Sequence, residues 1–387
     1  MTTEAERQIE GGYYTCNFQF GARDDTLIIN MGPQHPSTHG VLRILLELDG
    51  EYVVRAEPIL GYLHRMHEKM AEVKLPNQFI PNMGRVDYLH ALAWNWAYVG
   101  AVERLGGIEV PERAEYLRVI TTELNRVASH LVWWGAYLLD LGAFTPILYA
   151  FDDREQLLDT LQMVTGSRLT YSYFRFGGVY QDAPPEFFAR IREFIPRMRS
   201  RMKMYRELVT KNMILVGRTE GIGVIPAEMC RRYGATGPIL RSAGVPCDLR
   251  RTEPYSVYDR FDFDIPVYHQ ACSYARYNQR LDEIEQSLRI LEQAIETIPD
   301  GPIQPAKPIK ATYGMPTGEA SFAVEGARGK VKVWVAGDGG KKPYRVKLRS
   351  PSFSNLSLFA EAAQGILLAD AVVILGSLDL VIPELDR

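Results

Sequence analysis

Histidines gather in the first quarter of the chain. Five of the seven lie there, at positions 35, 39, 64, 67 and 90. Histidine is a common metal ligand, but structural zinc and iron–sulfur sites add paired thiolates to it. The four cysteines, at positions 16, 230, 247 and 272, form no C-x-x-C pair. We therefore expect no metal site on this chain, and reduced thiols that lie mostly in the core.

His39 differs from the other histidines because its loop is stiff. The segment 31–40 reads MGPQHPSTHG, with two prolines that fix φ and two glycines that permit close backbone approach. A neutral imidazole with a pKa of about 6.5 can donate a hydrogen bond or deliver a proton at cellular pH. On residue type alone, a histidine that only satisfies backbone carbonyls in a tight loop is the better explanation.

Two further residues could act beside such an imidazole. Tyr88, in the segment 85–90 (RVDYLH), falls at the expected start of the first long helix, where a phenol can donate to a bound oxygen. Asp140, in the segment 138–142 (LLDLG), falls among apolar residues at a helix C-terminus, where a carboxylate needs a partner such as His39. Taken alone, each is also compatible with a structural role.

Strands are expected near both ends of the chain. Near the N-terminus, 26–29, 41–48 and 52–54 have strand character, and Asp49-Gly50 is a hairpin signal. Near the C-terminus, 330–335 alternates, 337–340 is a glycine-rich turn and 345–349 returns. A small antiparallel sheet and a later hairpin follow from these patterns.

Long helices are expected between the strands, because apolar residues recur there every three or four positions. The stripes run from Leu89 to Val99, ended by Gly106-Gly107; from Leu117 to Leu138; from an Asp152-Asp153 cap to Gly166; from Phe187 to Tyr205, opened by Pro184-Pro185; and from Tyr274 to Ile295. Together they predict an α+β fold, in which a central bundle of long α-helices is flanked by the N-terminal sheet and a C-terminal β-containing region.

These patterns divide the chain into four parts. They are an N-terminal extension (1–25), a β region with the His39 loop (26–65), a helical bundle with an inserted Gly-, Pro- and Arg-rich segment at 217–266 (66–300), and a C-terminal α/β region (301–387). The proline-rich stretch 299–316 is the expected hinge before the last part.

The bulk properties exclude several classes of protein. A net charge of −3 over 387 residues offers no general basic surface, so a nucleic-acid partner is not expected. Residues 1–12 lack the apolar region of a secretory signal, so the chain is expected to stay inside the cell. The longest apolar stretch, 366–382, is broken by two aspartates and is shorter than the roughly 18 to 20 residues of a membrane span. Nucleotide-binding glycine motifs are incomplete at 221–223 and 337–342.

Seven collinear strings resemble the D-type subunit family of respiratory complex I, from about residue 26 to the end. They are GPQHPSTHGVLR at 32–43, GYLHR at 61–65, ELNR at 123–126, DLGAFTP at 140–146, RFGG at 175–178, LRSAGV at 240–245, and SLD at 377–379 with the tail LDR at 385–387. That family is similar to the large subunits of nickel–iron hydrogenases, and the resemblance implies the same fold.

The hydrogenase comparison implies a lost metal site. Hydrogenases read R-x-C-x-x-C where this chain has RVDYLH at 85–90, and D-P-C-x-x-C where it has DLVIPE at 379–384. The four thiolate positions are therefore Asp87, His90, Val381 and Glu384, and nickel has no soft ligands. The resemblance implies that the emptied pocket takes a quinone headgroup. A nickel enzyme and a purely structural scaffold are the alternatives.

The resemblance also implies roles for individual residues. His39 and Tyr88 would hydrogen-bond the quinone oxygens, and Asp140 would orient His39. Arg65 and Arg85 would face the terminal iron–sulfur cluster of a partner. The chain itself would bind no cofactor besides its quinone substrate, since the iron–sulfur clusters and FMN would lie in other subunits.

The implied partners are the small iron–sulfur subunit, a C-type peripheral subunit and a membrane-arm subunit at the quinone entry. Electron transfer would be coupled to proton translocation, at the cytoplasmic side of the inner (plasma) membrane. Three residues depart from the family: Thr170 stands where many relatives have a histidine near the cluster, and Leu380 and Pro383 alter the tail. The quinone, the donor (NADH or a carrier such as ferredoxin) and the pumped ion remain open.

Overall fold

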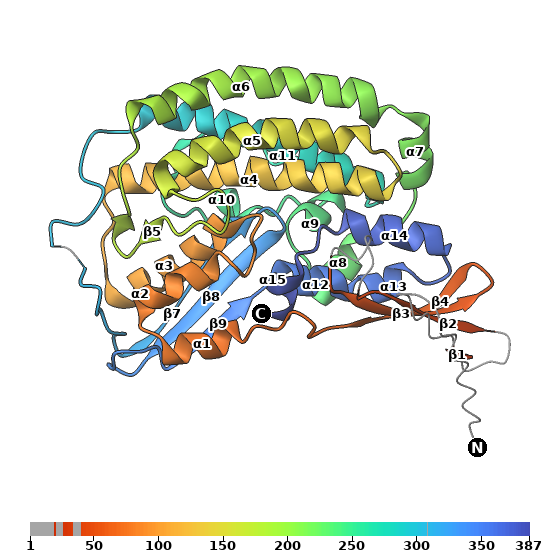
Figure 1. Cartoon of the computed structure of the whole chain (residues 1–387), viewed down its shortest axis with the longest axis horizontal. Coiled ribbons are helices and arrows are strands. Elements are labelled where there is room, and N and C mark those ends of the chain that lie inside the picture. Colours follow the sequence, from red (N-terminus) through yellow and green to blue (C-terminus); the bar gives the residue numbers. More distant parts are fainter. Residues whose placement is uncertain (1–18, 21–25, 34–39, 308) are drawn as a thin grey trace, which may run out of the picture.

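The computed structural model describes residues 19–20, 26–33, 40–307 and 309–387 (Figure 1). Long helices lie side by side across one half of the molecule, and the two larger of its three antiparallel sheets lie across the other. The predicted α+β fold is thus confirmed. Within the described part of the chain, no helix has the length and apolar character to cross a membrane.

The N-terminal sheet has the strand order β1-β2-β3-β4, with every neighbouring pair antiparallel. Its strands are β1 (Gln19–Phe20), β2 (Leu27–Met31), β3 (Arg43–Asp49) and β4 (Tyr52–Ile59). Alternate residues of β3 point into the core, as the period of a strand requires. Gly50 adopts a positive φ of 59° in the β3–β4 turn, which confirms the predicted hairpin.

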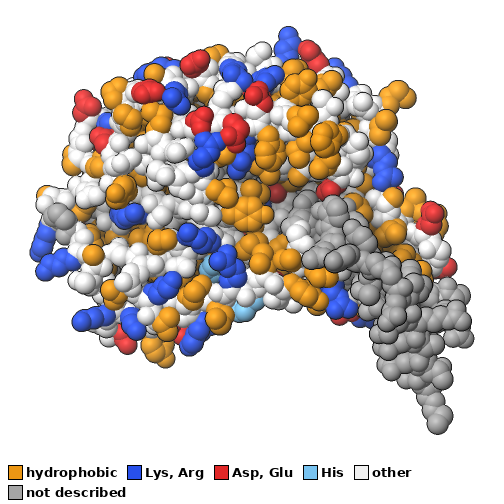
Figure 2. Space-filling model, viewed as in Figure 1, with side chains coloured by type: hydrophobic (Ala, Val, Ile, Leu, Met, Phe, Trp, Pro, Cys, Tyr) orange, Lys and Arg blue, Asp and Glu red, His pale blue; other side chains and the backbone are white. Residues whose placement is uncertain are grey.

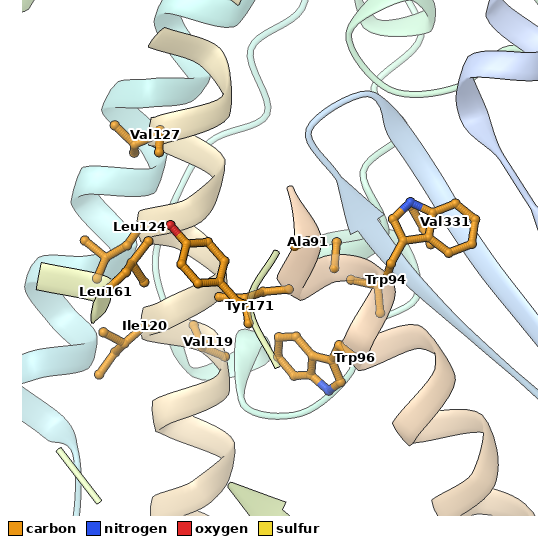
Figure 3. Close-up of a cluster of buried hydrophobic side chains, with 14 of the residues drawn as sticks. Ala91, Trp94, Trp96, Val119, Ile120, Leu124, Val127, Leu161, Tyr171 and Val331 are labelled. Atoms are coloured by element: carbon orange, nitrogen blue, oxygen red, sulfur yellow. The ribbon is translucent and has the colours of Figure 1, made fainter. Parts of the chain in front are cut away.

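The bundle is built around α4, which packs against its neighbours along most of its length (Figure 1). Its long helices are α3 (Ala91–Gly106), α4 (Glu112–Asp140), α5 (Thr145–Thr165), α6 (Pro185–Tyr205) and α11 (Ser273–Thr297). Figure 3 shows α3 and α4 contributing tryptophan and aliphatic side chains to one buried cluster. The predicted end of α3 is confirmed, because Gly107 caps it in the left-handed conformation.

Two predicted helix starts are wrong. α3 begins only at Ala91, because the Asp87 carboxylate accepts the backbone N–H groups of Leu89 and His90 and holds 87–90 in a turn. Tyr88 therefore lies just before the helix. α5 begins at Thr145, well before the expected cap at Asp152-Asp153. Asp153 is instead buried in the middle of the helix, where it accepts hydrogen bonds from α6.

The C-terminal sheet contains one strand more than the predicted hairpin. β8 (Gly329–Gly337) pairs with β9 (Arg345–Arg349) as expected. The additional strand, β7 (Gly318–Gly326), pairs with the other edge of β8. β7 packs against α3. The tight β7–β8 turn packs closely against Thr236. A Cβ added to Gly329 would lie 2.5 Å from the hydroxyl oxygen of Thr236 and 2.8 Å from its carbonyl carbon. This turn carries Arg328 into the core.

Short elements fill the spaces between these layers. Around the bundle lie α1 (His67–Val73), α2 (Pro76–Met83), β5 (Phe174–Arg175), β6 (Gly178–Val179), η2 (Arg206–Thr210), α7 (Met213–Thr219), α8 (Ala227–Tyr233), α9 (Pro238–Ser242), α10 (Leu249–Thr252) and η3 (Tyr258–Arg260). The chain ends in α12 (Pro351–Ser357), α13 (Phe359–Ala362), α14 (Leu368–Ser377) and α15 (Ile382–Asp386). The described cysteines are free thiols, two of them buried as expected (Cys230 and Cys272).

Candidate functional site

The two segments that the resemblance aligns with the hydrogenase cysteine motifs meet at Arg328. The turn before α3 contributes Asp87, whose Oδ2 lies 2.8 Å from Arg328 Nη1. The segment between α14 and α15 contributes Asp379, whose Oδ1 lies 3.3 Å from Arg328 Nη2. All three side chains are buried. One guanidinium therefore bridges the two segments at the place where the resemblance implies a lost metal.

His90 is locked in a neutral form behind this ion pair. Its Nδ1 accepts the backbone N–H of Ala327 at 2.9 Å, so the ring proton lies on Nε2, which points to the Thr122 carbonyl at 3.2 Å. Burial, followed by the charge of Arg126, lowers the pKa of His90 well below its usual value. His90 therefore acts as a structural residue and not as a proton donor at neutral pH.

Glu384 completes the group from α15. It is fully buried and accepts hydrogen bonds from Ser352 Oγ at 2.8 Å and Ser350 Oγ at 3.3 Å. Burial, and then the charge of Asp87, raises the pKa of Glu384 to about 8. No group of three or more His, Cys, Asp or Glu side chains in the described part of the chain could hold a metal ion.

Tyr88 lies half-buried at the edge of this cluster. Burial is the main cause that raises the pKa of its phenol, and the charges of Arg328, Asp87 and Asp379 act on the phenol as well. The phenol therefore stays protonated across the neutral range and can donate a hydrogen bond. The sequence-predicted Tyr88 thus stands next to the replaced thiolate positions.

Asp140 approaches the same region from α4. It is the last residue of that helix and half-buried, and its Oδ2 would lie 3.4 Å from a Cβ placed on Gly376 of α14. Trp133 fixes the contact, because its Nε1 donates to the Gly376 carbonyl at 2.9 Å. Asp140 therefore approaches α14 at Gly376, near its C-terminal end, and Tyr88 lies within electrostatic reach of Asp379, two residues beyond that end. His39, the third predicted residue, lies outside the described residues.

Arg65 and Arg85 both lie within electrostatic reach of the buried His67. Both arginines are exposed, whereas His67 is only 1% exposed and neither of its ring nitrogens has a hydrogen-bond partner within the described residues. Burial, then the charges of Arg65 and other nearby cations, lowers the pKa of His67 to about 4. Thr170 is close to this cationic surface, since its carbonyl carbon would lie 3.3 Å from a Cβ on Gly84.

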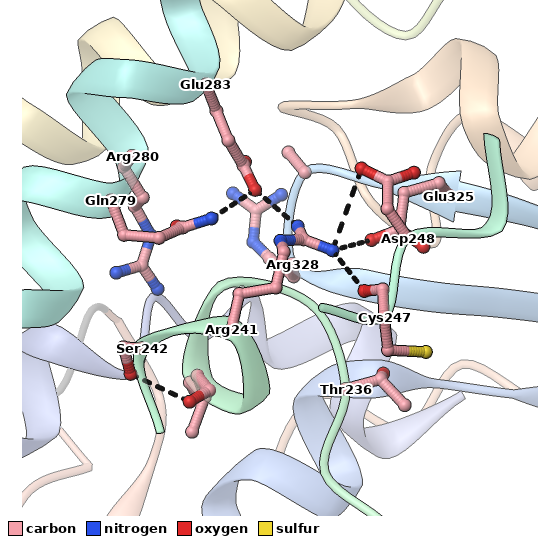
Figure 4. Close-up of polar contacts among 12 residues, drawn as sticks. Thr236, Arg241, Ser242, Cys247, Asp248, Gln279, Arg280, Glu283, Glu325 and Arg328 are labelled. Carbon is pink, nitrogen blue, oxygen red and sulfur yellow. Dashed lines mark hydrogen bonds and ion pairs between the residues drawn. The ribbon is translucent and has the colours of Figure 1, made fainter. Parts of the chain in front are cut away.

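Sequence reasoning missed a buried charge network next to the site. Figure 4 shows Arg241 of α9 reaching Glu283 of α11 on one side and Glu325 of β7 on the other. A second arginine, Arg250, links Asp248 at 2.7 Å to Glu123 of α4 at 3.0 Å. The strings ELNR and LRSAGV carry two of these residues, so the signal was present, but it does not tell which charges pair.

Hydrophobic side chains remain exposed at one end of the bundle, where α4 meets α5 and α6 leads into α7. Figure 2 shows such side chains gathered at the right-hand end of the bundle. The bundle-end patch consists of Leu139, Phe144, Leu148, Phe151, Leu208, Met213 and Ile214, with Met213 88% exposed. Single exposed apolar residues are ordinary, but a contiguous group marks an interaction surface.

Comparisons with known proteins agree with one another. A family model described as the 49 kDa subunit of the respiratory-chain NADH dehydrogenase matches residues 140–387. The NADH-quinone oxidoreductase D-type subunit of Desulfotalea psychrophila is 59% identical over 364 residues, which cover 94% of this chain and 98% of the relative. The corresponding protein of Opitutus terrae is 57% identical, covering 95% and 92%, and that of Geobacillus thermodenitrificans is 51% identical, covering 94% and 99%.

Proposed function

This chain belongs to the 49 kDa subunit family of the respiratory-chain NADH dehydrogenase and is a subunit of an NADH:quinone oxidoreductase. From this premise we propose that it forms the cavity in which the quinone headgroup is reduced. One observation carries the proposal. The two segments that the resemblance aligns with the hydrogenase thiolate motifs are joined by the guanidinium of Arg328, and the protonated phenol of Tyr88 stands at their edge.

Reduction of a quinone consumes two electrons and two protons, so the cavity needs two acidic hydrogen-bond donors near the quinone oxygens. Tyr88 would donate to one oxygen and His39 to the other. Asp140 would orient the imidazole of His39 and stabilise its charged form. When the imidazole loses its proton to the quinone, the charge of Asp140 is no longer balanced, and this change would start the coupling to proton translocation.

A small iron–sulfur subunit would cover the surface of Arg65 and Arg85, and its terminal cluster would supply the electrons. Two exposed guanidiniums fit an anionic cluster and its cysteine thiolates, because a nearby fixed positive charge stabilises the reduced form and raises its reduction potential. The buried His67 beneath them, whose ring has no hydrogen-bond partner among the described residues, also fits a surface that is completed by another chain.

The bundle-end patch would meet the membrane-arm subunit at the quinone entry. An exposed apolar end next to α14 suits a partner whose own surface is apolar, and Asp140 lies at the inner border of this patch. The chain would thus sit at the cytoplasmic side of the inner (plasma) membrane as a peripheral subunit. The adjacent C-type peripheral subunit is proposed from the family resemblance.

The test is to compare His39→Ala and Tyr88→Phe with the surface control Tyr344→Phe in the purified complex. Each site variant should slow quinone reduction by at least about tenfold, because each removes a proton donor. Electron flow from NADH to an artificial acceptor at the flavin should stay normal, as should both activities of the control. An equal loss of the two activities would show that the variants only damage the assembly.

A further inference from the structure

Glu384 is a buried acid that has no role in the quinone reduction proposed above. Its carboxyl group accepts hydrogen bonds from the hydroxyls of Ser350 and Ser352. Within the described residues it forms no ion pair of 4.0 Å or less with a cation, although its side chain is fully buried. Taking an unpaired carboxylate out of water is costly, so a protonated acid is the favoured form.

The charges that face Glu384 from the surrounding elements also favour its protonated form. Asp87 and Asp379 already share the guanidinium of Arg328. Arg280 of α11 lies 3.7 Å from Asp379. Arg349 of β9 also acts on Glu384, but its guanidinium donates to the carbonyls of Lys330 and Gly234. An ionised Glu384 would therefore add a third carboxylate around Arg328.

Tyr88 and Glu384 lie within electrostatic reach of the same buried pair, Asp87 and Arg328. The phenol is half-buried, follows Asp87 directly in the chain and lies within electrostatic reach of Arg328. We propose that the carboxylic acid of Glu384 is a proton reserve that reprotonates Tyr88 during quinone reduction. This inference rests on the proposed function of Tyr88.

NADH oxidation by the complex supplies two electrons to the quinone, and the two protons of the quinol come from Tyr88 and His39. The O–H bond of Tyr88 breaks as an O–H bond of the quinol forms, and the resulting phenolate takes the proton of Glu384. Glu384 is left as a carboxylate that faces Arg328, and it regains a proton from solvent before the next turnover.

The pH dependence follows from the environment of the acid. Burial and the charge of Asp87 raise the pKa of Glu384 to about 8, so the reserve is filled at neutral pH and empties as the pH rises through that value. Quinone reduction should therefore decline on the alkaline side of pH 8, whereas NADH oxidation at the flavin should not follow that decline.

Glu384→Gln in the purified complex tests the proposal, with Glu361→Gln as the matched control on the surface. The glutamine keeps the size and the serine contacts but carries no transferable proton. Quinone reduction at pH 7 should fall by about tenfold, with normal flavin activity. Redox-difference infrared spectra should lose the carbonyl band of a carboxylic acid that deprotonates on turnover. An unchanged rate together with an unchanged band would overturn the proposal.

Ser352→Ala provides a second test that retains the acid and does not depend on the glutamine variant assembling. The Ser352 hydroxyl donates to the carboxylate and so lowers the pKa of Glu384. Its removal should move the alkaline decline to higher pH, and a decline that stays in place would contradict the reserve. If Tyr88→Phe is slow but Glu384→Gln is normal, only the reserve fails. If both are normal, the proposed cavity fails as well.

Discussion

The guanidinium of Arg328 lies 2.8 Å from the carboxylate of Asp87, although Arg328 sits in the β7–β8 turn and Asp87 precedes α3. The same carboxylate, through Oδ1, holds the backbone N–H groups of Leu89 and His90. Asp87 therefore fixes both the turn that carries Tyr88 and the cation behind it. The C-terminal sheet is in this way tied directly to the residues that we assign to quinone.

Replacing Arg328 by glutamine should destabilise the chain strongly. The change leaves Asp87 and Asp379 buried without their shared cation, and breaking such a buried pair costs roughly 3 to 5 kcal/mol. We expect a lower thermal unfolding temperature and less assembled complex. The control is Arg345→Gln, whose own side chain is 46% exposed and pairs with Glu68 and Glu72 at the protein surface. A surface ion pair contributes about 1 kcal/mol or less, so the control should assemble normally.

The long helices could be predicted from the sequence because their apolar stripes are continuous. The stripe from Leu117 to Leu138 became α4, and the one from Tyr274 to Ile295 became α11. The start of α5 was missed because Asp152-Asp153 resembles a cap, whereas the charge of Asp153 is satisfied by Arg201 of α6. A tertiary partner of this kind leaves no local signal.

The candidate site was predictable only in part. The replaced thiolate positions named Asp87 and Glu384, but the cation that joins the two segments could not be read from the sequence. Arg328 stands in GARGK, a string typical of a solvated turn, and becomes buried only because β7 pairs with β8. Likewise, Arg241 and Arg250 look like surface charges until the chain folds onto α11 and α4.

His67 should make the chain sensitive to acid. Its folded-state pKa of about 4 lies below the usual 6.5, so the unfolded chain binds a proton in that interval and the folded chain does not. Stability is therefore lost as the pH falls from about 6.5 towards 4, by roughly 2 kcal/mol at pH 5. His67→Leu should remove this loss. Thermal unfolding at pH 5 and pH 8 measures it, and a His67→Leu variant that keeps the parent's pH dependence would contradict the prediction.

Gly178→Ala should destabilise the chain through a backbone clash. A Cβ at Gly178 would lie 1.9 Å from the carbonyl oxygen of Ile303, which also accepts the N–H of Val179 at 3.2 Å. The β6 strand would have to move away, at a cost of roughly 2 kcal/mol or more. Gly217→Ala is the matched control, since nothing lies within 4 Å of its Cβ position in α7. There alanine should be neutral or stabilising by up to about 1 kcal/mol.

The bundle-end patch should be needed for assembly and not for folding. Ile214 is 70% exposed at the start of α7, so Ile214→Asp removes no core contact and should leave the thermal unfolding of the chain within about 0.5 kcal/mol of the parent. The variant should nevertheless reduce the fraction of the chain that is recovered with the membrane-arm subunits, because a charge would be buried in an apolar contact. Tyr344→Asp, at the 71% exposed Tyr344 beside β9, should be recovered normally. If Ile214→Asp is recovered as fully as that control, another surface binds the membrane arm.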